Sequence, residues 1–237
     1  MIPLRDINPT ESRPVVTYVL LALNVVVYGY QASLSEVAFT ELVHRYGMVP
    51  YYLTQDFRVD SLSTPLTSMF LHGSWLHLIF NMWFLFIFGD NVEDRLGVPR
   101  FLGFYLLCGM LAAAAQTLVA PESRVPMVGA SGAIAGVLGA YFKLFPSARV
   151  VTVIPIFFFF MIRELPAVLF IVAWFIFQLL LGVSSIGRAG EGGVAFFAHI
   201  GGFLAGLWLL GLFMRGRDPD RGRRRIGPRQ PPEGGLH

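Results

Sequence analysis

The chain carries too few charged residues to cover a folded domain of its length with a water-exposed surface. Only 14% of its 237 residues are charged, whereas soluble domains carry about 25%. Apolar residues make up 55% of the sequence, and the mean hydropathy is +0.62. Six helices of about 20 residues each, the length that crosses a bilayer, would use half of the chain. We therefore expect a membrane protein built as a single all-α bundle.

Six apolar segments are separated by proline, glycine and polar residues, which commonly end helices. The first 14 residues are polar and lack the layout of a cleavable signal peptide, so the first segment is expected to remain as a helix. A turn that reaches back to His72 precedes the second segment, and the aromatic stretch at 157–160 is expected to lead into the fifth. The six expected membrane helices cover residues 15–30, 75–88, 101–119, 131–145, 165–182 and 194–214.

The distribution of Lys and Arg predicts the orientation of this bundle, because cytoplasmic connections carry an excess of both residues. With the N-terminus inside, 14 of the 18 fall in cytoplasmic segments and four in outer connections. Both termini are therefore expected in the cytoplasm: residues 1–14 as a short leading segment, and residues 215–237 as a basic, disordered tail. The arginines of this tail are interpreted as a topology signal, with contact to anionic lipid headgroups as the alternative.

The first outer connection, residues 32–64, is long for a loop and is expected to have structure of its own. It mixes apolar side chains with charged ones such as Glu41, Arg45 and Asp56. This mixture favours an element that lies at the membrane interface, partly buried in lipid.

Polar residues inside the predicted spans are the candidates for function, because such residues are costly in a membrane. They are His72, His77, Asn81, Ser131 and His199. Each of them alone could instead form a hydrogen bond between neighbouring helices.

Their depth in the membrane argues against unrelated structural roles. At about 1.5 Å of rise per residue, Ser131 lies roughly 22 Å above the cytoplasmic end of its helix. By the same measure His199 lies roughly 24 Å up and His77 roughly 20 Å up, with Asn81 one turn lower. Three helices therefore bring polar side chains to nearly one level, below the outer surface of the hydrocarbon core.

The fourth segment has 15 residues from Ser131 to Phe145, too few to cross a core about 30 Å thick. Its N-terminus is therefore expected inside the membrane, reached by the loop 121–130. Irregular backbone at that depth is tolerated only inside protein or beside water, which predicts a water-filled cavity opening to the outer side. The free N–H groups of a helix start also favour a developing negative charge.

These groups suit acyl transfer by a serine nucleophile. Ser131 needs an adjacent base, and His199 is the histidine at that level without a second role. His77, Asn81 and the backbone N–H of Ser131 can donate hydrogen bonds to a tetrahedral intermediate. No Asp or Glu lies in the spans at this depth, so we expect a dyad and not a triad.

Glycines around these residues fit the same geometry. Gly129, two residues before Ser131, permits a tight turn against the cavity, and we group it with the oxyanion-hole residues. Gly202 and Gly206 follow His199 and allow its helix to approach the fourth helix closely.

The sequence resembles the rhomboid family over about 15–214. HGSWLHLIFN (72–81) carries the family's His-x4-His-x3-Asn pattern, GASG (129–132) its Gly-x-Ser motif, and AHIGGFLAG (198–206) its histidine with following glycines. EDRLG (93–97) is similar to the family's connection after the second helix.

The resemblance implies a six-transmembrane-helix rhomboid bundle with a short central fourth helix, and a role for each motif residue. Ser131 and His199 would form the catalytic dyad, and His77 and Asn81 would help to form the oxyanion hole. His72 would be mainly structural, holding the loop above the site.

Two departures from the family pattern stand out. Many rhomboids carry a Trp-Arg pair in the first outer loop, where this chain has Ser63 and Thr64. Some carry a Tyr stacked on the catalytic histidine, four residues after the serine, where this chain has Ala135. Neither departure removes a reacting group.

The implied activity is that of a serine endopeptidase which cleaves membrane proteins in or near their transmembrane segments. The family's substrate-access region and lid would correspond to the fifth helix and the loop 182–193. Membrane lipids are expected partners, whereas nucleic acid, metal and organic cofactors are not, and the oligomeric state is open. A bacterial inner membrane is the expected location.

Two other functions are weighed against this one. One is a catalytically silent rhomboid-like protein that binds transmembrane clients, although such proteins usually lack the serine or the histidine. The other is a transporter or channel that uses its histidines as a proton relay.

Overall fold

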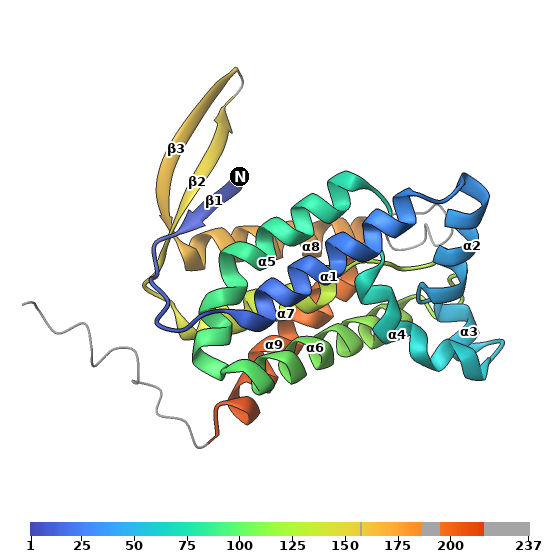
Figure 1. Ribbon diagram of the computed structural model, residues 1–237. Coiled ribbons are helices and arrows are strands. Elements are labelled where there is room, and N and C mark those ends of the chain that lie inside the picture. The colour runs from blue at the N-terminus through green and yellow to red at the C-terminus, as the bar shows by residue number, and fades with distance from the viewer. Residues whose placement is uncertain (157, 186–194, 216–237) are drawn as a thin grey trace, which may run out of the picture.

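The computed structural model describes residues 1–156, 158–185 and 195–215, and within them it is a helical bundle with a small sheet at one end (Figure 1). Six helices of this part of the chain form the bundle. They are α1 (Val15–Ala32), α5 (Trp75–Leu96), α6 (Val98–Val119), α7 (Ser131–Leu144), α8 (Ala167–Ser185) and α9 (Phe196–Phe213). All except α7 are long and apolar enough to cross a membrane, and the fold is that of the expected mostly helical membrane bundle.

The helix boundaries agree with the expected segments to within three residues except at α5, which continues eight residues beyond the predicted end. The extension is polar but buried: Glu93 is 1% exposed and accepts hydrogen bonds from the backbone N–H groups of Val16 and Thr17, at 2.8 Å each. It thereby satisfies two donors at the start of α1 that no helical carbonyl can reach. Gly97, with φ of 75°, then ends α5 and turns the chain into α6.

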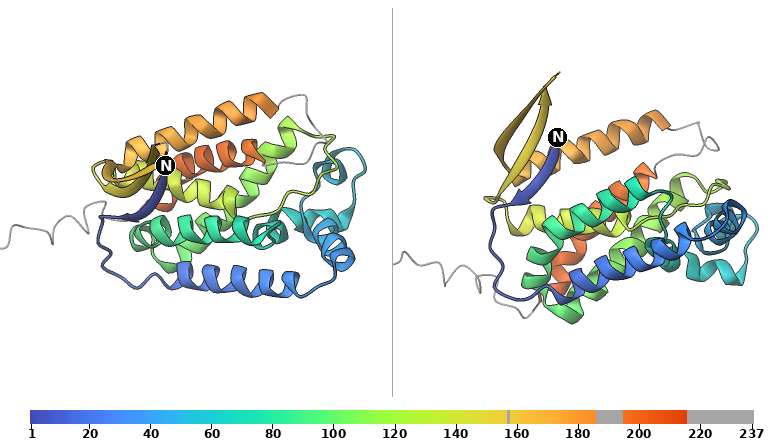
Figure 2. Two further views of the ribbon diagram at one scale, coloured as in Figure 1. Left: turned by 90° about the horizontal axis from the view of Figure 1, so that it is seen from above. Right: turned by 45° about the horizontal axis from the view of Figure 1, so that its top comes forward.

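Helix α7 is the central element, enclosed by α5, α6, α8 and α9 (Figure 2). It has 14 residues, and at about 1.5 Å per residue it spans only about 21 Å. Ten of its residues are buried, because small and aliphatic side chains face neighbours on every side. Its position fixes the place of Ser131, the first residue of the helix.

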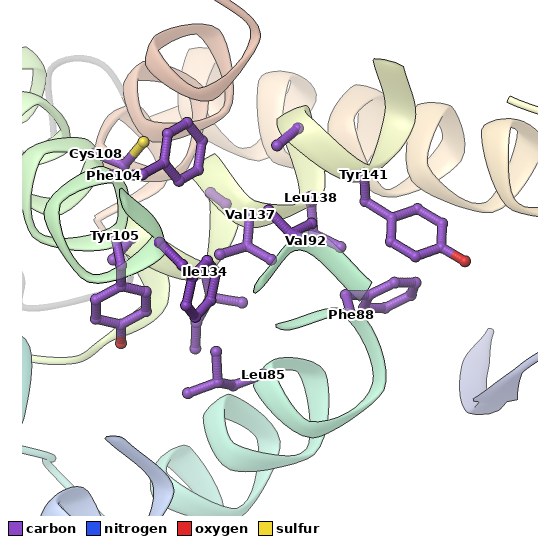
Figure 3. Close-up of a cluster of buried hydrophobic side chains, with 14 of the residues drawn as sticks. Leu85, Phe88, Val92, Phe104, Tyr105, Cys108, Ile134, Val137, Leu138 and Tyr141 are labelled. Atoms are coloured by element: carbon purple, nitrogen blue, oxygen red, sulfur yellow. The ribbon is translucent and has the colours of Figure 1, made fainter. Parts of the chain in front are cut away.

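The hydrophobic core lies where α5, α6 and α7 meet. Figure 3 shows side chains from all three helices pointing into one cluster. Its labelled members are Leu85, Phe88, Val92, Phe104, Tyr105, Cys108, Ile134, Val137, Leu138 and Tyr141.

The long outer connection has the structure of its own that was expected. It forms α2 (Glu36–Tyr46), α3 (Pro50–Thr54), η1 (Val59–Ser63), α4 (Thr64–Thr67) and η2 (Ser68–Phe70). A bridge between Met48 and Met127 joins it to the loop that precedes α7. Ser63 and Thr64 donate side-chain hydrogen bonds to the carbonyls of Asp60 and Ser61, so local bonds order the segment that lacks the Trp-Arg pair.

A three-stranded antiparallel sheet was not predicted from the sequence. It consists of β1 (Ile2–Asp6), β2 (Arg149–Ile156) and β3 (Phe159–Pro166) in that order. The fifth helix was expected to begin at residue 165, with the aromatic stretch 157–160 leading into it. Residues 159–166 instead form a strand, and the helix begins directly after it, at Ala167. The leading segment 1–14 is likewise held to the bundle through β1, which pairs with β2 at the end of the helices opposite α2 and α3 (Figure 1).

Candidate active site

Ser131 is the first residue of α7, reached through a turn that requires glycine. Gly129 has φ of 123°, a conformation that other residues rarely adopt. A Cβ atom at this position would lie 2.7 Å from the imidazole ring of His77. The Gly129 N–H donates to the carbonyl of Ser68 at 2.9 Å, which fixes the turn to the outer connection.

The Oγ of Ser131 lies 2.7 Å from Nε2 of His199, on α9. The two residues are 68 positions apart in the sequence and come together because α9 packs directly on α7. His199 is 9% exposed, so its ring is held within the bundle. A hydroxyl and an imidazole at this distance can exchange a proton without any movement of the backbone.

The other ring nitrogen of His199 contacts a residue that the sequence analysis missed. Nδ1 lies 2.7 Å from Oε1 of Gln178, on α8. The Gln178 side chain is 8% exposed, in a helix whose mean hydropathy is 2.4 over residues 167–184. This isolated amide within an apolar helix was the available signal, because such a group must find a partner.

An aromatic ring packs near His199, although Ala135 stands where some rhomboids have a stacked Tyr. The ring belongs to Trp174 on α8, and the two ring centroids are 6.1 Å apart with an interplanar angle of 35°. Helix α8 therefore makes both a polar and an aromatic contact with the same imidazole.

His77 and Asn81 lie one turn apart on α5 and line the same cavity as Ser131 and His199. The cavity has a volume of about 410 Å³. The amide nitrogen of Asn81 is buried and, among the described residues, has no hydrogen-bond partner. Two possible donors thus face the space next to the serine.

His72 lies beside this site and is fully buried. Gln31 of α1 clamps its backbone, accepting from the His72 N–H at 3.0 Å and donating to the His72 carbonyl at 3.2 Å. The His72 ring packs against His77, with centroids 5.2 Å apart. His72 therefore contacts His77 and is not among the residues that line the cavity beside Ser131.

Gly202 and Gly206 lie at the contact between α9 and α7. A Cβ atom on either would collide with the backbone carbonyl of α7, at Gly132 and Gly136 respectively. The helix axes can approach this closely only because both positions lack a side chain. The spacing that brings His199 to Ser131 depends on this contact.

Part of the expected lid falls on residues 186–194, outside the described residues. Among the residues that the structure describes, no group of three or more His, Cys, Asp or Glu side chains gathers that could hold a metal ion.

Residues 60–216 match the Rhomboid domain family, a stretch that contains every candidate site residue. The chain belongs to the rhomboid family. This rhomboid is 30% identical over 179 residues to the presenilin-associated rhomboid-like protein A, mitochondrial, of Danio rerio. The matched stretch covers 73% of this chain and 44% of the Danio rerio protein.

Two further relatives come from yeast and from a bacterium. Rhomboid protein 1, mitochondrial, of Saccharomyces cerevisiae is 33% identical over 137 residues, which is 56% of this rhomboid and 37% of the yeast protein. Rhomboid protease GluP of Bacillus subtilis is 32% identical over 130 residues, 55% of this chain and 24% of its own length. This rhomboid spans less than half the length of each of these relatives.

Proposed function

We propose that this rhomboid is an intramembrane serine endopeptidase that hydrolyses peptide bonds in or near the transmembrane segments of membrane proteins. The observation that carries the proposal is the 2.7 Å separation between Ser131 Oγ and His199 Nε2 beside a cavity. Membership of a family with a named bacterial protease supports it.

In the acylation step, Ser131 Oγ attacks the carbonyl carbon of the scissile peptide while His199 Nε2 accepts the hydroxyl proton. The tetrahedral intermediate then collapses as His199 returns this proton to the leaving nitrogen. The peptide C–N bond breaks, the amine product departs, and an ester on Ser131 remains. Nε2 of His199 can perform both transfers because it stays within hydrogen-bond reach of the serine, 2.7 Å from its Oγ.

The negative charge of the intermediate develops on the former carbonyl oxygen. We assign its stabilisation to the amide of Asn81, the ring N–H of His77 and the backbone N–H of Ser131. The last of these belongs to the first turn of α7, where N–H groups have no helical carbonyl partner. Donors that are already aimed at the charge need no reorganisation during the reaction.

In deacylation Ser131 becomes the leaving group, and His199 again acts first as a base and then as an acid. A water molecule gives a proton to His199 and its oxygen attacks the ester carbonyl of Ser131. Collapse of the second intermediate releases the carboxyl product, and the Ser131 oxygen takes the proton back from His199. The cavity must therefore connect to water, which we place on the outer side above α7.

A transmembrane substrate has to unwind before it can react, since the carbonyls of a helix in lipid are hydrogen-bonded internally. We infer that it reaches the serine between α5 and α8. Phe84 of α5 and Trp174 of α8 both line the cavity. The family's access region, as the resemblance implies it, lies on this side.

A serine-directed fluorophosphonate tests the proposal on purified protein in detergent micelles. Labelling is expected to depend on Ser131 and to disappear in Ser131→Ala, together with cleavage of a transmembrane substrate. Ser184→Ala is the matched control, because Ser184 is exposed on α8, does not line the cavity, and donates a hydrogen bond to the carbonyl of Leu181. Cleavage that continues undiminished in Ser131→Ala would refute the assignment.

The alternative of a catalytically silent, client-binding rhomboid makes a different prediction for the unmodified protein. It would bind transmembrane clients but neither react with the probe nor cleave them. A comparison of shed protein fragments from cells that carry the wild type or Ser131→Ala distinguishes the two.

We further propose that both termini lie in the cytoplasm, on the evidence of the Lys and Arg distribution. Reporter fusions to the two ends test this orientation, and an external C-terminus would contradict it. The location in a bacterial inner membrane stays a prediction, since the relatives include both mitochondrial and bacterial proteins.

A further inference from the structure

Gln178 makes a contact that the Ser-His chemistry alone does not require. Its amide lies in the apolar helix α8, where an unpaired polar group would be costly. The only polar group that its Oε1 is found to contact is Nδ1 of His199, at 2.7 Å, within the described part of the chain. The Gln178 side chain is therefore held by its contact with the imidazole of His199.

The hydrogen-bonding capacity of the two groups determines the tautomer of His199. The amide oxygen of a glutamine only accepts, so an Oε1 facing Nδ1 requires the proton of the neutral imidazole on Nδ1. Nε2 then carries the lone pair, and Nε2 is the atom that lies 2.7 Å from Ser131 Oγ. The opposite tautomer would place an N–H on Nε2 and leave it unable to accept the serine proton.

We propose that Gln178 is a positioning residue that holds His199 in the tautomer with its proton on Nδ1, and so makes a third member of the catalytic group. It does this as a neutral amide. In a buried site a neutral acceptor avoids the desolvation cost of a carboxylate, although it stabilises the imidazolium less strongly. Trp174, one turn earlier on α8, packs near the same ring and restricts its tilt.

This inference rests on the proposed function, and the experiment keeps the two apart. The second-order rate constant of fluorophosphonate labelling is measured for the wild type, Gln178→Met and Gln178→Glu between pH 5 and 9. Gln178→Met keeps the length of the side chain but cannot accept, and it should lower the rate constant about 10²- to 10⁴-fold. Gln178→Glu should recover most of the rate and move the acidic limb of the pH profile upward.

A spectroscopic readout separates this role from a merely structural one. Nitrogen-15 NMR of histidine-labelled protein is expected to show the Nδ1–H form of His199 in the wild type and a shift toward the Nε2–H form in Gln178→Met. His199→Gln identifies the signal. Ile176→Met is the matched control, because this side chain is exposed on the same helix.

Three outcomes are informative. A Gln178→Met variant with an unchanged tautomer and labelling within threefold of the wild type overturns the inference. A changed tautomer together with slow labelling supports it, even where the variant has lost some stability. If the wild type itself does not label, the proposed function fails first.

A second proposal rests on a separate observation, the hairpin of β2 and β3. The strands pair from Arg149 with Pro166 to Ile156 with Phe159, whereas β1 covers β2 only over residues 150–153. The outer half of the hairpin is therefore two-stranded. Figure 1 shows it running across the direction of the bundle helices and away from the bundle.

The outer half of the hairpin is apolar on both faces. Phe158, Phe159 and Phe160 are 95%, 78% and 76% exposed, and successive residues of a strand point to opposite faces. The charged residues of the hairpin, Arg149, Arg163 and Glu164, are confined to its base. A two-faced aromatic hairpin in water would invite strand pairing and aggregation, so something covers it.

The chain connectivity indicates that the surface of the membrane covers these aromatic side chains. Helix α8 begins at Ala167, directly after β3, and the Ala167 N–H bonds to the carbonyl of Ala148 at 2.8 Å. The base of the hairpin is thus fixed at the end of a membrane-spanning helix whose exposed face is also apolar, with Leu169 and Ile176 60% and 48% exposed. The exposed apolar face of α8 thus starts directly after the last residue of the hairpin.

We infer that Phe158, Phe159 and Phe160, at the outer end of the hairpin, lie in the headgroup region of the same membrane, on the side of the termini, with their rings at the acyl boundary. The hairpin cannot lie deeper, because the outer edge of β3 has unpaired backbone groups that hydrocarbon does not tolerate. Aromatic residues at the level of the headgroups anchor a membrane protein against tilt and vertical movement.

Electron paramagnetic resonance of the protein in liposomes tests this placement. A nitroxide is attached at Phe159→Cys in a Cys108→Ala background, and its collisions with oxygen and with a water-soluble nickel chelate are compared. High oxygen and low nickel accessibility are expected at the tip, and the reverse at Glu164→Cys, the control at the base. Nickel accessibility at the tip equal to that of the control would overturn the proposal, as would a label shielded from both, which indicates a protein partner.

Discussion

The side chain of Asp6 accepts a hydrogen bond from the hydroxyl of Tyr141, with 2.8 Å between the two oxygens. Asn91 of α5 donates to the same carboxylate oxygen at 2.8 Å. Asp6 belongs to β1, and Tyr141 lies on α7 near the end opposite Ser131. The first strand is therefore hydrogen-bonded to the helix that begins at Ser131, although the two are far apart in the sequence.

The Asp6 carboxyl predicts a pH dependence of stability. Burial, with a further contribution from the nearby Asp90 carboxylate, raises the pKa of Asp6 from 3.8 to about 6 against the opposing hydrogen bond of Tyr141. The folded state then binds this proton more tightly than the unfolded state. Its contribution to stability is present below about pH 4 and is lost as the pH rises to about 6.

Asp6→Asn is expected to remove this dependence, because the amide has the same shape and does not ionise. Between pH 4 and 7 the wild type should lose about 1–2 kcal/mol relative to the variant, allowing for the partial exposure of the carboxyl. Thermal unfolding in detergent micelles across this pH range measures the difference. Asp60→Asn, at an exposed carboxylate, should leave the wild-type slope in place.

The buried hydrogen bonds of Glu93 predict that shortening its side chain will lower the stability of the protein by a large amount. Glu93→Ala leaves two N–H groups of α1 without an acceptor in a buried position, at a cost of about 2–4 kcal/mol. Glu93→Gln keeps one carbonyl oxygen and should lose less. Thermal unfolding ranks the two variants, and an alanine variant as stable as the glutamine variant would contradict the capping role.

Gly206 predicts that the contact between α7 and α9 tolerates no added methyl group. Gly206→Ala would press a Cβ atom on the Gly136 carbonyl and separate the helices, costing about 1–3 kcal/mol and slowing probe labelling of Ser131. Gly211→Ala is the matched control on the same helix, since a Cβ there meets nothing within 4 Å. Equal unfolding temperatures for the two variants would exclude this account of the glycine.

Asn81 predicts a defect in catalysis and not in binding. Asn81→Ala removes one of the donors that we propose for the oxyanion, so kcat for a peptide substrate should fall about 10²- to 10³-fold with KM changed little. Asn24→Ala removes a buried amide on α1 that bonds to the carbonyl of Leu20 and does not line the cavity, and it should retain the wild-type kcat. A variant of Asn81 with normal kcat and raised KM would assign the amide to substrate binding.

The sequence alone predicted those features of the fold that depend on local backbone chemistry or on the thickness of the bilayer. Proline and glycine end helices through their own backbone chemistry, so the start of α7 at Ser131 and the breaks before α6 and after α9 could be predicted within a few residues. Helical rise converts residue number into height, and on this basis Ser131, His199 and His77 were predicted to lie near one level; in the structure all three line one cavity. The sequence also predicted structure in the long outer connection.

The tertiary structure decided what depends on partners distant in the sequence. Strand pairing of residues 2–6 with 149–156 joins two segments that are far apart in the sequence, and neither segment alone indicates its partner, so the sheet was missed. The polar extension of α5 is helical because Glu93 accepts hydrogen bonds from the free N–H groups at the start of α1. Gln178 could be noticed in the sequence as an isolated amide, but only the packing of α8 beside α9 shows that it faces Nδ1 of His199.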